Sequence, residues 1–254
     1  MRIVSISDTH NRHKHLTSKG MGNILPDGDL LIHAGDLTGQ GAKSEVENVI
    51  EWMIKQAPRY THGIVFIAGN HDRSFDPKFG EHAADDEMEE KPKQKPVWLR
   101  HILSDLELSD YGVHYLENSS MTINNINIWG SPYSPWFHGD RWAFNSHRGP
   151  EIEAIWAQIP FGTNIVVTHT PISYKLDYVP RNNEYTGCEQ LRNKIQQIKP
   201  LLHFSGHIHE SRGFDYDAYT YYFNSCICNL NYEPNNKPFE IDVDWDNEEV
   251  KIVN

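Results

Sequence analysis

Five apolar, strand-length runs of this sequence are each followed by side chains of types that can bind metal ions. The runs are followed by Asp8 and His10, by Asp36, by Asn70, His71 and Asp72, by His169, and by His207 and His209. In an α/β sheet, ligands bind at the carboxyl ends of the strands, so these side chains are expected to converge on one place. A buried group of carboxylates and imidazoles needs bound cations, because isolated buried charges are too costly.

The number of donors predicts two metal ions. Seven side chains are expected to be ligands: Asp8, His10, Asp36, Asn70, His169, His207 and His209. They fit two ions about 3.5–4 Å apart that share one carboxylate, as in two-metal hydrolytic sites. Oxygen and nitrogen donors without a thiolate suit Mn²⁺, the favoured ion here, or else iron or zinc. Donors two residues apart, as in "DTH" and "HIH", are expected to point the same way from extended segments.

Other candidate ligands near these segments are interpreted as structural. His203 lies inside the apolar run 201–205, so we expect a core histidine. His13 and His15 follow the first donors and are expected to be solvated. Cys226 and Cys228 are interpreted as small buried apolar residues.

The elements that position the donors follow an α/β pattern. Continuous apolar runs, typical of strands covered on both faces, occupy residues 2–7, 29–33, 63–68, 164–168 and 201–205. Apolar residues at helical spacing predict helices over 43–57 and 150–159, with a further helix near 187–198. Residues 121–129 predict two short strands about an Asn-Asn turn, and the tail predicts three strands in "YTYYFNS", "FEIDV" and "EEVKIV".

Composition bounds the partners and the location of the chain. A net charge of −12 over 254 residues, with "KPKQK" as the longest basic stretch, disfavours long nucleic acid as a partner. No apolar run approaches the roughly 18 residues of a membrane span, so we expect no membrane association and a cytoplasmic location. Three cysteines argue against a disulfide scaffold. We expect one domain over 1–254 with a solvated insertion at 81–96, and the oligomeric state stays open.

The ordered motifs "DTH", "GD", "GNHD", "TH" and "GHIH" resemble those of the calcineurin-like metallophosphoesterase superfamily. The resemblance implies an α/β sandwich of two packed mixed β-sheets flanked by helices. It also implies ligand sets: Asp8, His10 and His209 for one ion, Asn70, His169 and His207 for the other, and Asp36 bridging both. His71 would protonate or stabilise the leaving oxygen, and Asp72 would orient His71.

A closer resemblance, to the metallophosphoesterase-domain-containing (brain 239 protein) group, rests on "PYSPWF", "LDYVP", "GHIHE" and "FNSC". It implies a phosphodiesterase for small substrates, including nucleotides and cyclic nucleotides, that acts through a metal-bridging hydroxide. The second motif reads "GDLTGQG" and lacks the Asp-Arg pair of protein phosphatases. The alternatives are a phosphomonoesterase or nuclease of the same fold, or a weakly active binding or scaffold protein.

Residues beside these motifs are candidates for substrate contact. The loop 131–144 supplies Trp136 and Phe137, whose rings could stack on a base; equally, they could pack a covering loop. Asn11 and Arg12 follow the first ligands and are candidate contacts to a small phosphoester.

Overall fold

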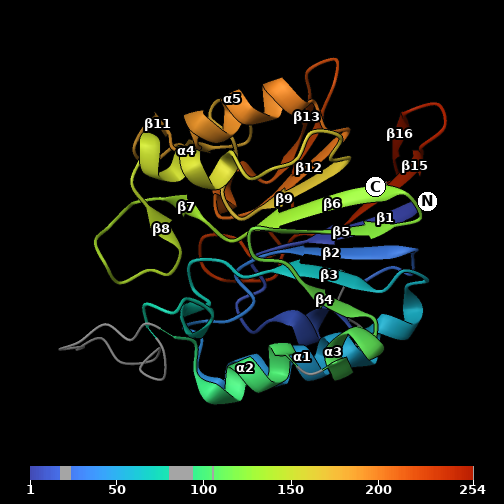
Figure 1. Cartoon of the computed structure of the whole chain (residues 1–254), viewed down its shortest axis with the longest axis vertical. Helices are drawn as coiled ribbons and strands as arrows, with labels where there is room; N and C mark the ends of the chain where they lie inside the picture. Colours follow the sequence, from blue (N-terminus) through green and yellow to red (C-terminus); the bar gives the residue numbers. More distant parts are fainter. Residues whose placement is uncertain (18–23, 80–93, 105, 254) are drawn as a thin grey trace.

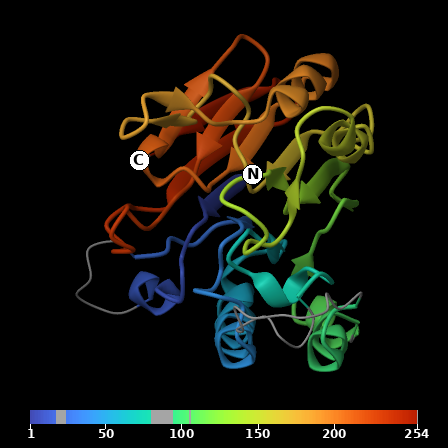
Figure 2. The same cartoon turned by 90° about the vertical axis from the view of Figure 1, so that its left-hand side faces the viewer.

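Two six-stranded sheets form the centre of the molecule (Figures 1 and 2). The computed structural model describes residues 1–17, 24–79, 94–104 and 106–253. The first sheet runs, in spatial order, β16 (Glu249–Ile252), β15 (Phe239–Asp244), β1 (Arg2–Ile6), β2 (Leu30–Ala34), β3 (Ile64–Ile67) and β4 (Val113–Tyr115). The second runs β13 (Gly213–Tyr216), β14 (Tyr221–Asn224), β12 (Leu202–Ser205), β9 (Ile165–Thr168), β6 (Ile126–Ser131) and β5 (Ser119–Ile123).

Helices cover the outer face of each sheet, as Figure 1 shows. Below the first sheet lie α1 (Lys43–Gln56), α2 (Val97–Ser104) and α3 (Leu106–Asp110). Above the second lie α4 (Pro150–Trp156) and α5 (Glu189–Ile198). Both sheets mix parallel and antiparallel pairs, so the predicted α/β sandwich of two mixed sheets flanked by helices is confirmed.

The central strands are mostly apolar because both of their faces are covered. Between the sheets, Ile32 and Ile67 share a buried cluster with Val167 and Phe204. The opposite face of the first sheet packs on α1, whose apolar residues repeat with helical spacing: Val46, Val49, Ile50 and Met53. The opposite face of the second sheet packs in the same way on α4 and α5. Successive side chains along each strand therefore point alternately into the core between the sheets and into the core beneath the helices.

Most predicted elements are present with slightly different ends. The predicted helices over 43–57 and 150–159 are α1 and α4, and the Asn-Asn turn joins β5 to β6. Both asparagines of this turn have positive φ, 47° and 65°, as a type I′ hairpin turn requires. Elements that the sequence did not predict are α2, α3, β4 and β13, and the short pairs β7 (Ser134–Pro135) with β8 (Asn145–Ser146) and β10 (Tyr178–Val179) with β11 (Glu184–Tyr185).

The predicted insertion at 81–96 lies largely outside the described residues. Of it, only 94–96 are described, and there the Lys95 ammonium lies 3.0 Å from the Glu117 carboxylate. Within the described part of the chain, no helix has both the length and the apolarity that a membrane span requires.

Three histidines outside the metal-ligand set are fully enclosed: His33, His203 and His13. His203, in β12, is 1% exposed and its Nε2 lies 2.8 Å from Thr168 Oγ1, so its interpretation as a core histidine is confirmed. His13 was expected to be solvated, which is wrong: it is 1% exposed, and its ring packs beside Trp52. The 3-10 helix His13–Leu16 turns this side chain back toward α1. Burial lowers the pKa of His203 to about 3 and that of His13 to about 4.

We expect His203 and His13 to make the fold sensitive to acid. Unfolding exposes the rings and restores a pKa near 6.5, so below that pH the unfolded chain binds more protons than the folded one. Stability should therefore fall as pH drops from about 6.5 toward the folded pKa values, by about 2 kcal/mol per histidine at pH 5. The free energy of unfolding, measured in denaturant at pH 7 and pH 5, should show a smaller loss for His203→Gln than for the parent. His101→Gln, on the exposed surface of α2, is the control; identical losses in all three proteins would contradict the prediction.

Candidate metal centre

The carboxyl ends of five parallel strands bring the predicted ligands together. In the first sheet β1, β2 and β3 are parallel neighbours, and in the second sheet β9 and β12 are parallel neighbours. Their ends lie toward the side that Figure 2 turns to the viewer, beside β7, β8 and β11. The ligands therefore come from both sheets and meet where the sheets face each other.

The first cluster consists of Asp8, His10 and His209, whose potential ligand atoms lie within 4.8 Å of one another. His209 Nε2 lies 3.2 Å from Asp8 Oδ1 and 3.3 Å from His10 Nε2. Asp8 and His10 are buried, and His209 is nearly so. This is the ligand set that the resemblance implies for the first ion.

The second cluster consists of Asp36, His169 and His207, joined by Asn70. His169 Nε2 lies 2.9 Å from Asn70 Oδ1 and 3.4 Å from Asp36 Oδ2. The rings of His169 and His207 lie 5.0 Å apart. The four side chains come from four different strand ends, and they correspond to the second predicted ligand set together with the shared carboxylate.

The Asp36 carboxylate lies between the two clusters. Its Oδ2 is 3.7 Å from His10 Nε2 and 3.4 Å from His169 Nε2. Its Oδ1 accepts a hydrogen bond from the backbone N–H of His71 at 2.8 Å, which fixes the orientation of the carboxylate. This geometry is that of a carboxylate placed to bridge two cations.

Backbone carbonyls leave the inward-facing imidazole nitrogens free to bind metal. The Nδ1–H groups of His10, His169 and His209 donate to the carbonyls of Thr38, Ala34 and Asn229, at 3.2, 3.0 and 2.9 Å. Because a carbonyl can only accept, the proton of a neutral ring stays on Nδ1 and the Nε2 lone pair faces the cluster. Metal-bound histidines are held in this way. The donor set therefore fits two cations.

The buried carboxylates of Asp8 and Asp36 are stabilised by positive charge beside them. Burial acts to lower the pKa of His169, but the Asp36 carboxylate outweighs it and raises that pKa to about 9. Burial also acts to lower the pKa of His209, but the Asp8 carboxylate outweighs it and raises that pKa to about 9. For Asp36, burial acts to raise the pKa, yet the charges on His169 and His71 hold it well below its usual value. Bound cations supply the charge that these protons otherwise provide.

The ligand turns have left-handed backbone, which corrects the prediction of extended segments. The φ angles are 51° at Asp8, 40° at His10, 55° at Asp36 and 69° at His207. His209 begins the 3-10 helix His209–Ser211. As a result His207 and His209 reach different clusters, although they are only two residues apart. Non-glycine residues at positive φ are uncommon, and they concentrate at functional sites where the surrounding structure holds them.

Two glycines allow the backbone to approach the carboxylates. A Cβ at Gly69 would lie 2.3 Å from Asp36 Oδ1, and one at Gly206 would lie 2.1 Å from Asp8 Oδ2. Any larger residue would displace a ligand. The glycines of "GNHD" and "GHIH" are therefore required by the close approach of the ligands.

His71 lies beside both clusters without joining the predicted ligand set. Its ring contacts His10, with the ring centroids 4.5 Å apart, and its Nδ1 donates to the Gly39 carbonyl at 2.7 Å. The expectation that Asp72 orients this ring is corrected: the Asp72 carboxylate accepts from the backbone N–H groups of Leu37, Thr38 and Gly69, at 3.1, 2.9 and 2.8 Å. Asp72 is buried beneath the turns, so it holds the loop that carries Asp36, and Gly39 orients the imidazole.

A cavity of about 460 Å³ opens over the two clusters. Its floor includes Asp36, Asn70, His71, His207 and His209, and its wall includes the predicted Trp136 and Phe137. The Phe137 ring lies 5.0 Å from that of His207. Asn11 and Arg12 do not line this cavity: the Asn11 amide donates to Glu45 at 2.5 Å, and Arg12 is exposed at the start of the next turn.

Two side chains beside the first cluster were not predicted from the sequence. The Tyr232 ring lies 4.7 Å from that of His10 and 5.6 Å from that of His209, and it forms part of the cavity wall. The Cys226 thiol, which is fully buried, donates to Asp8 Oδ2 at 3.1 Å. The alternating run "SCICN" gave only an apolar signal, so the interpretation of Cys226 as a plain apolar residue needs correction.

Removing the Cys226 thiol is expected to weaken the first metal position. Cys226→Ala takes away one donor to Asp8, and loss of such an outer partner typically costs about 10–100-fold in metal affinity. Cys226→Ser retains a donor and should recover most of it. Calorimetric titration of metal-stripped protein with Mn²⁺ measures the change, with Cys228→Ala as the control because its thiol faces the Thr9 carbonyl. Equal affinity in Cys226→Ala and the parent would contradict the prediction.

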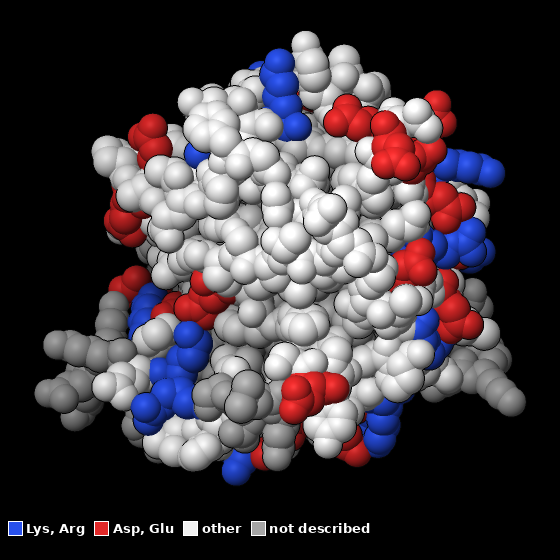
Figure 3. Space-filling view, turned by 45° about the vertical axis from the view of Figure 1, so that its right-hand side comes forward, with Lys and Arg blue, Asp and Glu red and all other residues white. Residues whose placement is uncertain are grey.

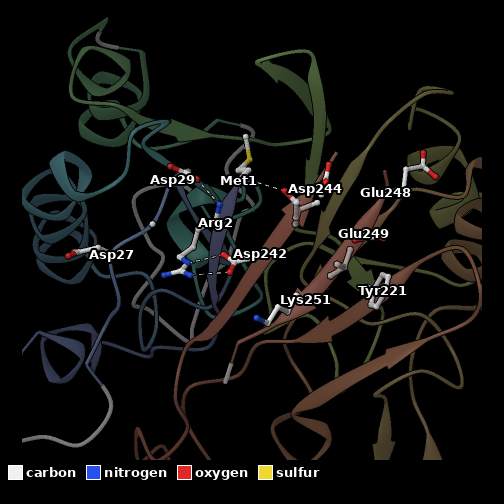
Figure 4. A pocket seen from close by; sticks show the side chains of 13 residues that line it. Met1, Arg2, Asp27, Asp29, Tyr221, Asp242, Asp244, Glu248, Glu249 and Lys251 are labelled. Atoms are coloured by element: carbon white, nitrogen blue, oxygen red, sulfur yellow. Dashed lines mark hydrogen bonds and ion pairs between the residues drawn. The ribbon is translucent and has the colours of Figure 1, made fainter. Parts of the chain in front are cut away.

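A larger hollow, of about 900 Å³, lies elsewhere, beside the start of β1 and the β15–β16 hairpin (Figure 4). Its charged side chains include Asp27, Asp242 and Glu249, and Arg2 pairs with Asp242 at 2.8 Å. None of its lining residues belongs to the metal clusters. On the face in Figure 3, Lys and Arg side chains are separated by Asp and Glu, and the described residues show no continuous basic area there.

Comparison with known proteins identifies the family. A family model described as calcineurin-like phosphoesterase matches residues 1–211. The chain belongs to this family. The resemblance predicted from the motifs is confirmed, and family membership together with the buried Asp/His clusters makes the chain a metal-dependent phosphoesterase.

Relatives of this calcineurin-like phosphoesterase span nearly its whole length. It is 38% identical over 246 residues to metallophosphoesterase domain-containing protein 1 of Homo sapiens, covering 95% of this chain and 71% of the human protein. It is 34% identical to UPF0046 protein T07D4.2 of Caenorhabditis elegans, covering 96% of this chain and 60% of the relative. The crystal structure of TT1561 of Thermus thermophilus aligns with a TM-score of 0.60 at 13% identity, over 100% and 98% of the two chains. That last likeness is one of fold alone.

Proposed function

We propose that this phosphoesterase cleaves phosphodiesters of small substrates, including nucleotides and cyclic nucleotides, with two Mn²⁺ ions or with iron or zinc. The observation that carries the proposal is the Asp36 carboxylate between two ligand clusters, with His71 beside them in a cavity of about 460 Å³. When bound, two cations supply an activated water near neutral pH and neutralise the phosphate.

The residues around the ions have separate tasks in this proposal. Asp8, His10 and His209 would hold one ion, Asn70, His169 and His207 the other, and Asp36 would join them. The His71 Nδ1–H is committed to the Gly39 carbonyl, which leaves Nε2 to act on the leaving oxygen. A diester is favoured because the cavity of about 460 Å³ exceeds the size of a phosphate alone and leaves room for a second ester group.

The aromatic wall supports a small organic substrate. Phe137 and Trp142 are stacked with their centroids 6.2 Å apart, and Trp142 lies 4.4 Å from the His71 ring. Stacking on a base contributes about 1–3 kcal/mol. The net charge of −12 supports a small phosphoester as partner, in place of long nucleic acid or a membrane. Three buried free cysteines support a reducing, cytoplasmic location.

Hydrolysis of bis(p-nitrophenyl) phosphate by metal-stripped protein, with and without added Mn²⁺, tests the proposal. We expect turnover only with metal, and faster turnover of this diester than of p-nitrophenyl phosphate. The opposite preference would favour a phosphomonoesterase, and the absence of metal-dependent turnover would favour a binding or scaffold role. A panel of 2′,3′- and 3′,5′-cyclic nucleotides then defines the substrate.

A further inference from the structure

An exposed guanidinium stands in the wall of the cavity over the metal centre. Arg181 belongs to the turn of the β10–β11 hairpin and lines the cavity together with Asn182, Glu184 and Tyr185. We propose that Arg181 binds a second phosphate group of the substrate, so that the enzyme prefers diesters that carry an additional phosphate. This inference rests on the proposed phosphodiesterase function and narrows its substrate class.

The hairpin is fixed to the metal centre. The hydroxyl of Ser211, in the 3-10 helix that begins with the ligand His209, donates to the Tyr178 carbonyl at 2.7 Å. At the base of the hairpin, the Asp177 carboxylate accepts from the backbone N–H groups of Tyr174 and Gly187 at 3.1 and 2.9 Å. The hairpin that carries Arg181 is therefore anchored to the segment that carries the ligand His209.

The two arginines that line the cavity differ in what they already bind. Arg148 donates to the carbonyls of Thr186 and Gly187, at 2.8 and 2.9 Å, and pairs with the Glu189 carboxylate. These bonds hold the loop and occupy the guanidinium. Arg181 is exposed and makes no hydrogen bond or ion pair with any residue that the structure describes. Its donors are therefore available to a ligand.

The charges around the cavity indicate which group the Arg181 guanidinium would bind. Two metal ions already neutralise the phosphate that is cleaved, so Arg181 is not needed there. Its planar fork matches the oxygens of a further phosphate, to which arginine binds with two parallel hydrogen bonds. Glu184 and Glu210 also line the cavity, and in the described structure neither forms an ion pair with Arg181. Their negative charges disfavour the binding of an anion that is not paired with a cation such as Arg181.

The test compares two substrates that differ by one phosphate: 2′,3′-cyclic AMP and the same compound phosphorylated at the 5′ position. We expect the Mn²⁺-loaded parent to prefer the phosphorylated compound in kcat/KM by about tenfold or more, as charged hydrogen bonds contribute roughly this much. Arg181→Gln should reduce the preference to near one, mainly through KM. Arg192→Gln is the matched control: its guanidinium lies over the Tyr174 ring outside the cavity lining and should leave the preference unchanged.

A binding measurement separates this inference from the function on which it rests. In calorimetry with the Mn²⁺-loaded protein, Arg181→Gln should weaken the binding of pyrophosphate more than that of inorganic phosphate. Glu184→Gln should strengthen pyrophosphate binding, since it removes a nearby negative charge. Equal losses for both anions, or no preference of the parent for the phosphorylated nucleotide, would overturn the role of Arg181 even where bis(p-nitrophenyl) phosphate is hydrolysed. Absence of all hydrolysis with intact anion binding would instead overturn the proposed function.

Discussion

Asp36→Asn is expected to lower the affinity for metal at both positions and to reduce turnover. The loss should exceed the roughly 10–100-fold that follows removal of a residue that only hydrogen-bonds a metal ligand. The backbone N–H of His71 donates to Asp36 Oδ1, so the amide oxygen of the variant will take that position. Its NH₂ group then faces His10 and His169, where Oδ2 of Asp36 lies 3.7 and 3.4 Å from the Nε2 atoms. Bound metal, counted by elemental analysis after gel filtration, should fall well below two ions per chain.

The control for this variant removes a carboxylate far from the site. Asp242→Asn breaks the exposed pair with Arg2 at the hollow of Figure 4, so metal content and turnover should match the parent. Two tightly bound ions in Asp36→Asn would show that this carboxylate does not bridge.

His71→Ala is expected to keep both ions and to slow turnover by about 10²–10⁴-fold for diesters with alkyl leaving groups. An alkoxide is a poor leaving group and needs the proton that His71 supplies. A p-nitrophenolate leaves without it, so the loss should be much smaller for bis(p-nitrophenyl) phosphate. Rates for the two kinds of diester, combined with metal counts, measure this difference.

A structural effect of the His71 substitution would lower both rates equally, and such a result would remove His71 from the proton transfer. His101→Ala, on the exposed surface of α2, controls for the loss of a histidine as such. The ring of His71 also packs on Trp142, so His71→Gln provides a second variant that fills more of the space.

The ligand set could be predicted from the sequence because it depends on residue type and on strand ends. Continuous apolar runs identify the central strands, and the residues that follow them meet at one edge of a parallel arrangement. The glycines in the motifs carry a geometric requirement, which the close approach of Gly206 to Asp8 explains. His203 could likewise be separated from His207, because it lies inside the strand and His207 lies beyond its end.

Features that depend on side-chain contacts between distant segments could not be predicted. Asp72 is next to His71 in the chain, yet its carboxylate caps the turn of another strand. Asn11 follows a ligand, but the left-handed turn directs its amide to Glu45 on α1. Tyr232 comes from a segment without a motif, and only the folded chain brings its ring against His10 and His209. The helix α2 begins directly after the polar stretch 81–96, and α3 is only five residues long, which is too short for helical spacing to identify.

The division of the ligands between the two halves of the sandwich has a mechanical consequence. Asp8, His10, Asp36 and Asn70 follow strands of one sheet, whereas His169, His207 and His209 follow strands of the other. Each cation would therefore tie the two halves together at one end, in addition to the apolar cluster between the sheets and the hydrogen bond from the Ser7 N–H to the Ser225 carbonyl. Hinge-like opening of the halves is thereby restrained at the place where the reaction occurs, and chelation would release that restraint along with the catalyst.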